Sequence, residues 1–405
     1  MIVREKYLQR LRDFIDKPFI KVITGIRRSG KSTLLLLLKD ELITRRIREA
    51  NIIHINLESF DYSEIITGND LYALVKSKII NQGRYYILLD EIQEVAAWEK
   101  AVDAMVVDLN IDLYLTGSNS KLLSSELATH LAGRYIDIHI QTLTFSEYLQ
   151  FREPPGKASG NNYYQAFSAF LRFGGFPVIH TSEYTIEAAY KIVFDIYSSA
   201  ILRDIVQRYN IRDIELLERV VKFIFENVGS RFSAKNIADY FKSQQRKIDL
   251  NTVYNYLEAL ESAFIIYRVH RYDLKGKEIL KTLEKFYLGD HSLLYAVMGY
   301  KDRLISGVLE NIVMLELKHR GYKVFTGKSE EREVDFIAEQ KEKRVYVQVA
   351  YHLSEPSTIS REFSPLLQVK DHYPKYVVTM DETWSDNIQG VRHFHIADFL
   401  MLNEY

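Results

Sequence analysis

Short apolar runs alternate with amphipathic stretches along the first third of the chain. The runs are too short for helices and rich in Ile, Val, Leu and Tyr, which predicts buried strands at residues 19–24, 51–57, 85–90, 112–116 and 135–140. Helical stretches at residues 32–47 and 71–80 lie between the first of these strands. Strands separated by helices pair in parallel, because the chain must cross over before it re-enters the sheet. Residues 1–150 are therefore predicted to form an α/β domain whose parallel sheet is covered on both faces.

The rest of the chain separates into two further regions. Residues 151–162 are rich in Pro, Gly, Ser and Asn and form the clearest linker. A helical pattern follows it and ends with two short helices and a strand hairpin, the element order of a winged helix-turn-helix. The last region begins with a helix near residues 304–320 and continues with strands and a further helix. The predicted domains are residues 1–150, 163–290 and 291–405.

Composition narrows the classes of function without choosing one. The 405 residues carry 53 Lys and Arg against 54 Asp and Glu, so any surface for nucleic acid must be a local patch. The sequence has no cysteine, which excludes disulfides, thiolate metal sites and cysteine nucleophiles. The charged N-terminus lacks the apolar region of a signal peptide, and no apolar run approaches the ~20 residues that span a bilayer. A cytoplasmic protein without a membrane partner is expected.

The junction between the first strand and the first long helix carries a phosphate-binding pattern. Residues 25–32 read Gly-Ile-Arg-Arg-Ser-Gly-Lys-Ser and match G-x-x-x-x-G-K-[ST]. The glycines let backbone N–H groups face an anion, Lys31 would reach the β- and γ-phosphates, and Ser32 would place its hydroxyl on Mg²⁺. The alternative is an ordinary glycine turn with a surface lysine, but the strand before the loop and the helix after it favour phosphate binding. Arg28 occupies an unconstrained position and faces either solvent or nucleotide. The predicted nucleotide-binding residues are Gly25, Arg28, Ser29, Gly30, Lys31, Ser32 and Thr33.

The third predicted strand ends in an acidic pair, Asp90 and Glu91. Ligands bind at the carboxyl ends of parallel strands, so both side chains are expected beside the phosphate loop. Asp90 would hold Mg²⁺, usually through water, and Glu91 would polarise the attacking water as a general base. An acidic pair at a strand end is common by itself, but the upstream loop favours the catalytic interpretation. The predicted cofactors are ATP and Mg²⁺, with Ser32 and Asp90 as metal ligands.

A further strand, at residues 113–119, ends in the polar sequence Thr-Gly-Ser-Asn. Together with the phosphate loop and the acidic pair it resembles the AAA-type ATPases, in which this position is called sensor 1. The resemblance implies that Ser118 or Asn119, with Asn119 preferred, lies between the catalytic water and the γ-phosphate; a turn cap is the alternative. In related ATPases an arginine in the region of Arg134 is an arginine finger for its own or a neighbouring site, whereas a salt-bridged surface arginine is the alternative. The sequence has no N-K-x-D guanine signature, which favours ATP over GTP.

Further segments resemble a large prokaryotic family that joins an AAA-type domain to a winged-helix region and a C-terminal domain similar to restriction endonucleases. They are the phosphate loop, Thr-Gly-Ser at 116–118, Leu-Thr-Phe-Ser-Glu-Tyr at 143–148, Phe-Gly-Gly-Phe-Pro at 173–177 and Glu-Asn-Ile-Val at 310–313. Only the first is specific for chemistry. The resemblance implies an α/β fold class: an AAA-type P-loop parallel sheet, then a helical and winged-helix region, then an α/β restriction-endonuclease-like domain.

That last implication can be tested on the residues of the C-terminal region. Restriction-type nucleases ligate Mg²⁺ with an acid on a helix, an aspartate on a strand and Glu-x-Lys on the next strand. Glu310 and Asp335 match the first two positions, but Gln348 and Ala350 stand where glutamate and lysine are required. The charge of the third ligand and the group that activates water are both missing. A degenerate domain with a structural or binding role is expected, and not an active nuclease.

The predicted winged helix does not decide whether the protein binds DNA or another protein. Its second helix offers Asn251, Thr252 and Asn255 to base edges or phosphates, but it carries neither Lys nor Arg, and such domains also pack against proteins. Positive side chains nearby could neutralise phosphates; they are Arg246, Lys247, Arg268, Arg271, Lys275 and Lys277. The first function considered is an ATPase whose nucleotide state controls the C-terminal domains, with or without DNA. The others are a nucleotide-controlled switch with slow turnover and a protein partner, and an ATP-dependent nuclease. If Arg134 acts in trans, the chain must also assemble into a homo-oligomer.

Overall fold

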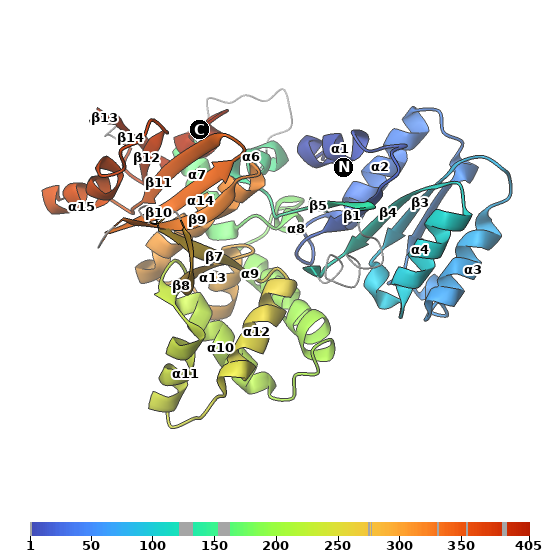
Figure 1. The fold of residues 1–405 in the computed structure, drawn as a ribbon, viewed down its shortest axis with the longest axis horizontal. Coiled ribbons are helices and arrows are strands. Elements are labelled where there is room, and N and C mark those ends of the chain that lie inside the picture. Colours follow the sequence, from blue (N-terminus) through green and yellow to red (C-terminus); the bar gives the residue numbers. More distant parts are fainter. Residues whose placement is uncertain are drawn as a thin grey trace. The chain divides into compact units, whose positions relative to one another are not determined.

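The computed structural model describes residues 2–120, 133–152, 163–273, 276, 278–329, 332–353, 355–382 and 387–405. The chain divides into two compact units (Figure 1): unit 1 is Met1–Ile140 with Ser262–Phe264, and unit 2 is Gln141–Glu261 with Ile265–Tyr405. No helix among the described residues combines the length and the hydropathy needed to span a lipid bilayer.

A five-stranded parallel sheet with the order β2-β3-β4-β1-β5 forms the centre of unit 1. Its strands are β1 (Ile20–Thr24), β2 (Ile52–Asn56), β3 (Tyr85–Asp90), β4 (Ile111–Gly117) and β5 (Tyr135–His139). All five strands and their parallel pairing were predicted from the sequence, and both are confirmed. Since β4 lies between β3 and β1, the carboxyl ends of these three strands meet at one edge of the sheet.

Helices cover both faces of this sheet because side chains alternate along each strand. On β3, Tyr85, Ile87 and Leu89 belong to the core that includes α3 and α4, whereas Tyr86 and Leu88 belong to the core that includes α1 and α2. Figure 1 shows the two helix pairs on opposite sides of the sheet. The helices are α1 (Glu5–Arg12), α2 (Lys31–Thr44), α3 (Gly68–Lys78) and α4 (Trp98–Asp108), with short 3₁₀ turns η1 (Glu49–Asn51), η2 (Phe60–Tyr62) and η3 (Ile92–Glu94).

Unit 2 begins with a helical region, as the sequence predicted. Its helices are α6 (Phe145–Arg152), α7 (Tyr163–Phe173), α8 (Pro177–His180), α9 (Ile186–Ser199), the π-helical η5 (Ala200–Gln207) and α10 (Ile214–Glu226). Pro177 is the first residue of α8, where its fixed φ angle suits the helix and its missing N–H costs nothing. The predicted linker overlaps the end of α6 at residues 151 and 152 and otherwise lies outside the described residues.

Two helices and a hairpin follow in the order that the sequence predicted. The elements are β6 (Arg231–Phe232), α11 (Ala234–Ser243), α12 (Leu250–Ser262), β7 (Ile266–Asp273) and β8 (Glu278–Leu288). Ser233 caps α11 in a reciprocal pair of hydrogen bonds with Asn236, which fixes where this helix begins. Strand β8 pairs antiparallel with both β7 and β6. The predicted turn at residues 275–277 is described only at Gly276.

One nine-stranded sheet extends through unit 2, with the order β13-β14-β12-β11-β10-β9-β7-β8-β6. Its C-terminal strands are β9 (Lys323–Ser329), β10 (Arg332–Gln340), β11 (Lys343–Val349), β12 (Lys375–Thr379), β13 (Asn387–Ile388) and β14 (Val391–His395). The accompanying helices are α13 (Ser292–Met298), η6 (Asp302–Leu304), α14 (Ile305–His319), α15 (Pro356–Leu367) and α16 (Ile396–Met401). Strand β7 pairs in parallel with β9, so the hairpin and the C-terminal strands share one sheet. The predicted boundary at residue 290 lies inside this compact unit, and the division into residues 163–290 and 291–405 stays a prediction.

Candidate active site

The predicted phosphate loop connects β1 to α2. Gly25 adopts φ 152°, and a Cβ atom at this position would lie 2.1 Å from the carbonyl oxygen of Ile140, so only glycine fits. Gly30, at φ 102°, is the N-cap of α2 and brings no side chain to the first N–H groups of that helix. The loop therefore leaves the positive end of α2 to an anion, as a phosphate site requires.

Two contacts orient the backbone at the centre of the loop. Ser29 is fully buried, and its hydroxyl has no hydrogen-bond partner among the described residues. The carbonyl oxygen of Ser29 accepts a hydrogen bond of 3.1 Å from the guanidinium of Arg4, which is itself buried. The C=O and N–H of a trans peptide point in opposite directions, so this contact turns the N–H of Gly30 away from Arg4. A bound phosphate would satisfy both the hydroxyl and the amide.

The remaining predicted binding residues of the loop are open to solvent. Arg28 adopts φ 65°, which is uncommon for a residue with a side chain, and its side chain is exposed. Ser32 and Thr33 in the first turn of α2 are exposed as well, so a ligand can reach their hydroxyls.

Lys31 lies inside the loop and is only 3% exposed. Its ammonium donates to the carbonyl oxygen of Gly25 at 3.2 Å and lies 3.5 Å from that of Ile26. It also lies 3.4 Å from a carboxylate oxygen of Glu91. The structure thus brings the lysine of the phosphate loop and the predicted general base into direct contact.

Asp90 is held at the carboxyl end of β3 by two hydroxyls. Thr116 on β4 donates to its carboxylate, and Ser32 forms a side-chain hydrogen bond with it. Burial raises the pKa of Asp90, and the two hydroxyls offset part of this rise. A buried carboxylate beside the hydroxyl of Ser32 is the pair of oxygen ligands that Mg²⁺ prefers, so these residues fit the predicted metal.

Glu91 follows at the left-handed backbone angle φ 54°. Its N–H donates to the hydroxyl of Thr116 at 2.9 Å, and Gln93 donates to its carboxylate at 2.5 Å. Burial by itself raises the pKa of Glu91, but the charge of Lys31 and the hydrogen bond from Gln93 outweigh it, so the pKa is lowered. Glu91 is therefore kept ionised, as a base that accepts a proton must be.

The two other predicted catalytic residues lie at opposite edges of the sheet. Asn119 and its neighbour Ser118 are buried directly after β4, at the same edge as the phosphate loop and Asp90. Arg134 precedes β5 at the other edge, where its carbonyl oxygen accepts from Ile20 at the start of β1. A five-residue strand, roughly 16 Å long, separates it from the loop of its own chain. Its side chain is 57% exposed and lies 3.6 Å from Asp103.

Sequence reasoning missed three residues that position this site: Arg4, Gln93 and Thr116. The signal for Thr116 was present, because a hydroxyl residue ends an apolar strand beside the strand of the acidic pair. Gln93 lies two residues after Glu91 and could have been found from its proximity. Arg4 lies 25 residues before Ser29, and no local pattern connects the two.

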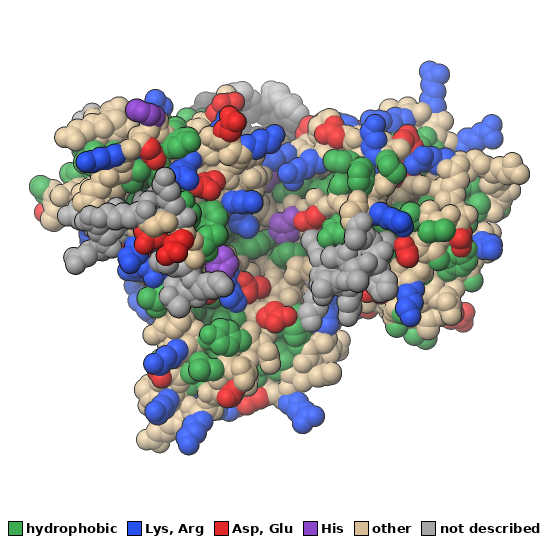
Figure 2. All heavy atoms as spheres, viewed as in Figure 1, with side chains coloured by type: hydrophobic (Ala, Val, Ile, Leu, Met, Phe, Trp, Pro, Cys, Tyr) green, Lys and Arg blue, Asp and Glu red, His purple; other side chains and the backbone are tan. Residues whose placement is uncertain are grey.

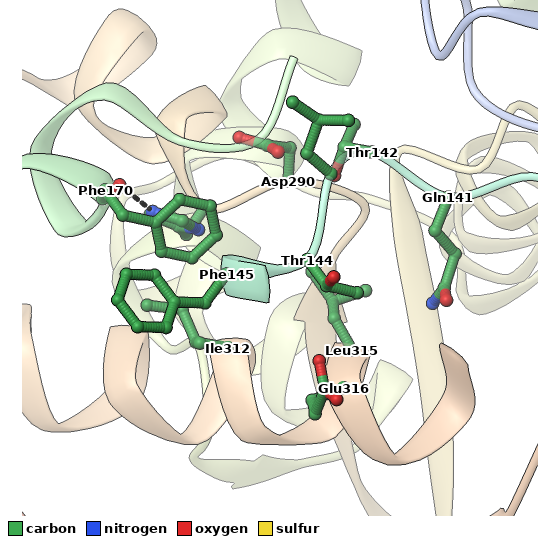
Figure 3. Close-up of a pocket in the computed structure, with 11 residues that line it drawn as sticks. Gln141, Thr142, Thr144, Phe145, Phe170, Asp290, Ile312, Leu315 and Glu316 are labelled. Atoms are coloured by element: carbon green, nitrogen blue, oxygen red, sulfur yellow. Dashed lines mark hydrogen bonds between the residues drawn. The ribbon is translucent and has the colours of Figure 1, made fainter. Parts of the chain in front are cut away.

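Two of the segments that carry the family resemblance, residues 143–148 and 310–313, contribute to the lining of a small cavity in unit 2. Figure 3 shows Phe145, Phe170 and Ile312 gathered together, with Asp290 above them. The cavity offers about 20 Å³ to the centre of a water molecule, which is room for one or two waters. The carboxylate of Asp290 accepts from the N–H of Gly175 at 2.8 Å, so it fixes the Gly-Gly turn. These segments pack against the helices of unit 2.

The structure also brings together the predicted nuclease-like residues. Glu310 on α14 and Asp335 on β10 share a contact with Lys285 of β8. Gln348 on β11 accepts a hydrogen bond from the N–H of Asp335, whereas Ala350 is buried.

The basic side chains expected near the winged helix are largely occupied by acidic neighbours. Arg246 contacts Glu215 at 3.0 Å, and Arg268 contacts Glu261 at 2.6 Å. Arg271 is buried, and Lys275 and Lys277 lie outside the described residues. Asn251 and Asn255 on α12 are exposed and Thr252 is half-buried.

Comparison with protein-family models supports the prediction of an AAA-type domain in unit 1. A model described as an AAA domain matches residues 17–149, and a model described as a domain of unknown function matches residues 164–304. The first match includes the phosphate loop, Asp90, Glu91, Asn119 and Arg134, and extends from before β1 to the residues after β5.

Relatives extend the likeness over both units. A protein of Haemophilus influenzae is 37% identical over 402 residues, which cover 99% of each chain. A protein of Methanocaldococcus jannaschii is 32% identical over 346 residues, 83% of this chain and 75% of that one. Among solved structures, a Walker-type ATPase of Pyrococcus abyssi superposes with a TM-score of 0.52 at 16% identity, covering 73% of this chain and 96% of that chain. At this identity the superposition shows a shared fold.

Proposed function

Because this chain belongs to one family with its Haemophilus influenzae and Methanocaldococcus jannaschii relatives and carries an AAA-type P-loop ATPase domain, we propose that it binds Mg-ATP at residues 25–33 and hydrolyses it. The observation that carries the proposal is the meeting of Lys31, Asp90 and Glu91 at the carboxyl edge of β1, β3 and β4. A cation for phosphate, an acid for the metal and an acid for water are what phosphoryl transfer to water requires.

Each residue has a distinct task in the proposed reaction. The N–H groups of the loop and of α2 bind the phosphates, and Lys31 neutralises charge on the β- and γ-phosphates. Ser32 and Asp90 would hold Mg²⁺, which neutralises phosphate charge when it is bound. Glu91 orients the attacking water and accepts its proton. Asn119 is proposed as the sensor of the γ-phosphate, since it follows β4 at the same edge.

The contact between Lys31 and Glu91 suggests how ATP itself prepares the base. A γ-phosphate carries more negative charge than a carboxylate and would compete for the ammonium of Lys31. The carboxylate of Glu91 would then lose its contact with Lys31 and keep the hydrogen bond from Gln93. Loss of the cation raises the proton affinity of a carboxylate, so Glu91 becomes a stronger base when substrate is present.

Two matched substitutions test the proposal. Lys31→Ala should abolish tight binding of a fluorescent ATP analogue, because the phosphates lose their main cation. Glu91→Gln should still bind the analogue but release phosphate roughly 10²–10⁴-fold more slowly, since glutamine cannot accept the proton. Glu94→Gln, an exposed acid three residues away, is the control and should leave both properties unchanged. Normal turnover in Glu91→Gln would assign the water-activating role to another residue.

We propose further that the nucleotide state of unit 1 controls unit 2, and that the elements α11, α12, β7 and β8, which follow one another in winged-helix order, act as a winged helix. DNA is one proposed partner, supported by the exposed amides of Asn251 and Asn255. The ion pairs of Arg246 and Arg268 favour the alternative, a protein partner, because paired cations release few counterions from DNA. On the face that Figure 2 shows, Lys and Arg side chains are interspersed with Asp and Glu side chains.

A titration with a fluorescent DNA duplex distinguishes the two partners. Binding through unit 2 should weaken steeply with salt and fall further in Lys247→Glu, an exposed residue near α12. Lack of binding at low salt would leave a protein as the partner of unit 2.

A further inference from the structure

A lysine lies at the centre of the acidic residues that occupy the nuclease-like position of unit 2. The ammonium of Lys285, on β8, lies 3.0 Å from Glu310, 2.8 Å from Glu333 and 3.0 Å from Asp335. Lys285 is 3% exposed, so its ammonium is surrounded by these carboxylates and not by water. The acids come from α14 and β10, so one ammonium joins three elements.

The carboxylates are also engaged by other donors. Tyr287 donates to the oxygen of Glu310 that faces Lys285, at 2.9 Å. The second oxygen of Asp335 accepts from the N–H of Val349 at 3.0 Å, and the second oxygen of Glu333 lies 2.7 Å from Arg231. A divalent metal needs several such oxygens directed at one point, but here that point is occupied by an ammonium.

Gln348 does not supply the missing ligand. Its amide oxygen, which is its only atom able to bind a hard cation, accepts from the N–H of Asp335 at 3.1 Å. Its amide nitrogen donates to Glu362 at 2.9 Å. Both ends of the side chain are thus used within the protein, and the residues present do not fit a resident metal.

We propose that Lys285 is a built-in cation that stands in place of the divalent metal of nuclease-like domains. The cluster of Lys285, Glu310, Glu333 and Asp335 then fastens the β7–β8 hairpin to α14 and β10, and no phosphodiester bond is hydrolysed there. The proposal goes beyond the ATPase and does not depend on it.

The cluster also explains the Glu-Asn-Ile-Val segment without catalysis. Glu310 contacts Lys285, and the next residue, Asn311, uses its amide on both backbone groups of Leu288. The Asn311 oxygen accepts from the Leu288 N–H at 2.5 Å, and its nitrogen donates to the Leu288 carbonyl at 3.1 Å. Consecutive residues of α14 therefore clamp the same strand, which is a structural reason for the pair.

Without its lysine the cluster would hold unbalanced negative charge. Burial raises the pKa of Glu310, and repulsion from Asp335 raises it further. Removing the ammonium leaves these buried acids without their cation, which is strongly destabilising. A divalent cation of the right size should then take the place that Lys285 leaves.

Binding of Mn²⁺ to the full chain in the absence of nucleotide tests the proposal directly. We expect the wild-type protein and Asp335→Asn to bind the same amount of Mn²⁺, as measured by electron paramagnetic resonance. DNA should also remain uncut with Mn²⁺ or Mg²⁺. Wild-type Mn²⁺ binding that depends on Asp335, or cleavage that depends on it, would overturn the proposal.

The variant Lys285→Ala supplies the positive test. It should melt several degrees lower in chelator, gain a Mn²⁺ site, recover its melting temperature with Mn²⁺, and lose that recovery when Asp335→Asn is added. Lys323→Ala, exposed on β9 of the same sheet, is the control and should show none of these effects. If Lys285→Ala does not fold, Lys285→Met with Glu333→Gln leaves one fewer unpaired acid and allows the same measurement. If the variant folds but gains no Mn²⁺ site, the proposal that Lys285 stands in place of a divalent metal is refuted.

Discussion

At the scale of single residues, the candidate site depends on side chains outside the sequence motifs. One hydroxyl, that of Thr116, contacts both the carboxylate of Asp90 and the backbone of Glu91, so it sets the spacing of the metal ligand and the base. One guanidinium, that of Arg4, fixes the orientation of the peptide between Ser29 and Gly30. Such positioning residues act through another group, and their loss should be felt mainly in the step that this group serves.

Arg4→Met should therefore weaken substrate binding more than chemistry. The variant loses a buried hydrogen bond from a charged donor, worth about 1.5 kcal/mol, which corresponds to a roughly tenfold rise in KM for ATP. The value of kcat should change little, because Glu91 and Asp90 keep their partners. Arg10→Met, an exposed substitution on α1, the helix that Arg4 precedes, is the matched control. A loss in kcat with an unchanged KM would show that Arg4 serves the chemical step instead.

At the scale of elements, the sequence predicts best what is local. The strands of unit 1 were predicted because each is a short apolar run, and the phosphate loop because its pattern is contiguous. Helix α4 was missed although Trp98, Ala101, Val102 and Met105 follow a helical period, so that miss was avoidable. Strands β6 and β13 have two residues each and exist only through pairing, which no periodicity reveals.

The parts of the sites that the sequence could not predict are contacts between distant segments. Arg4 reaches Ser29 across 25 residues, and Lys285 reaches Asp335 across 50. The resemblance to nucleases concerns Gln348 on β11 and Ala350 directly after it. The cation that contacts Asp335 is Lys285, which lies on β8. The lysine that fills the nuclease-like position was therefore invisible until the sheet of unit 2 was assembled.

The short helix α8 makes the stability of unit 2 sensitive to acid. His180 is buried with its ring nitrogen on the carbonyl oxygen of Gly174, and burial lowers its pKa to about 4 despite that hydrogen bond. The unfolded chain binds a proton near pH 6.5, so this stability is present above about pH 6.5 and is lost as the pH falls toward 4. At pH 5 the loss should be about 2 kcal/mol.

Urea unfolding followed by circular dichroism at pH 7.5 and pH 5 measures this loss. His180→Gln should have a smaller difference between the two pH values, because the titrating group is gone. His372→Gln, at an exposed position, should keep the wild-type difference. An unchanged difference in His180→Gln would assign the acid sensitivity to other buried groups, such as His291.

At the scale of the whole molecule, the pairing of β7 with β9 joins the hairpin to the C-terminal strands. The sequence separates a winged-helix region from a C-terminal region, but the hairpin of the first is part of the sheet of the second. Lys285 adds an ionic contact between the same two regions. A signal received by α12 would therefore reach the C-terminal strands within one compact unit.

The position of Arg134 predicts that the chain assembles with a second copy of itself. The residue is exposed at the edge of the sheet opposite the phosphate loop, so it can complete an active site only in a second copy of the chain. Arg134→Ala should then lower ATP turnover strongly, and turnover per chain in the wild type should rise with protein concentration. Mixing Arg134→Ala with Lys31→Ala should restore part of the activity, because one variant supplies an intact site and the other an intact arginine. Arg45→Ala, an exposed substitution directly after α2, should behave as the wild type in every mixture. Wild-type turnover in Arg134→Ala at all concentrations would leave Arg134 as the surface partner of Asp103.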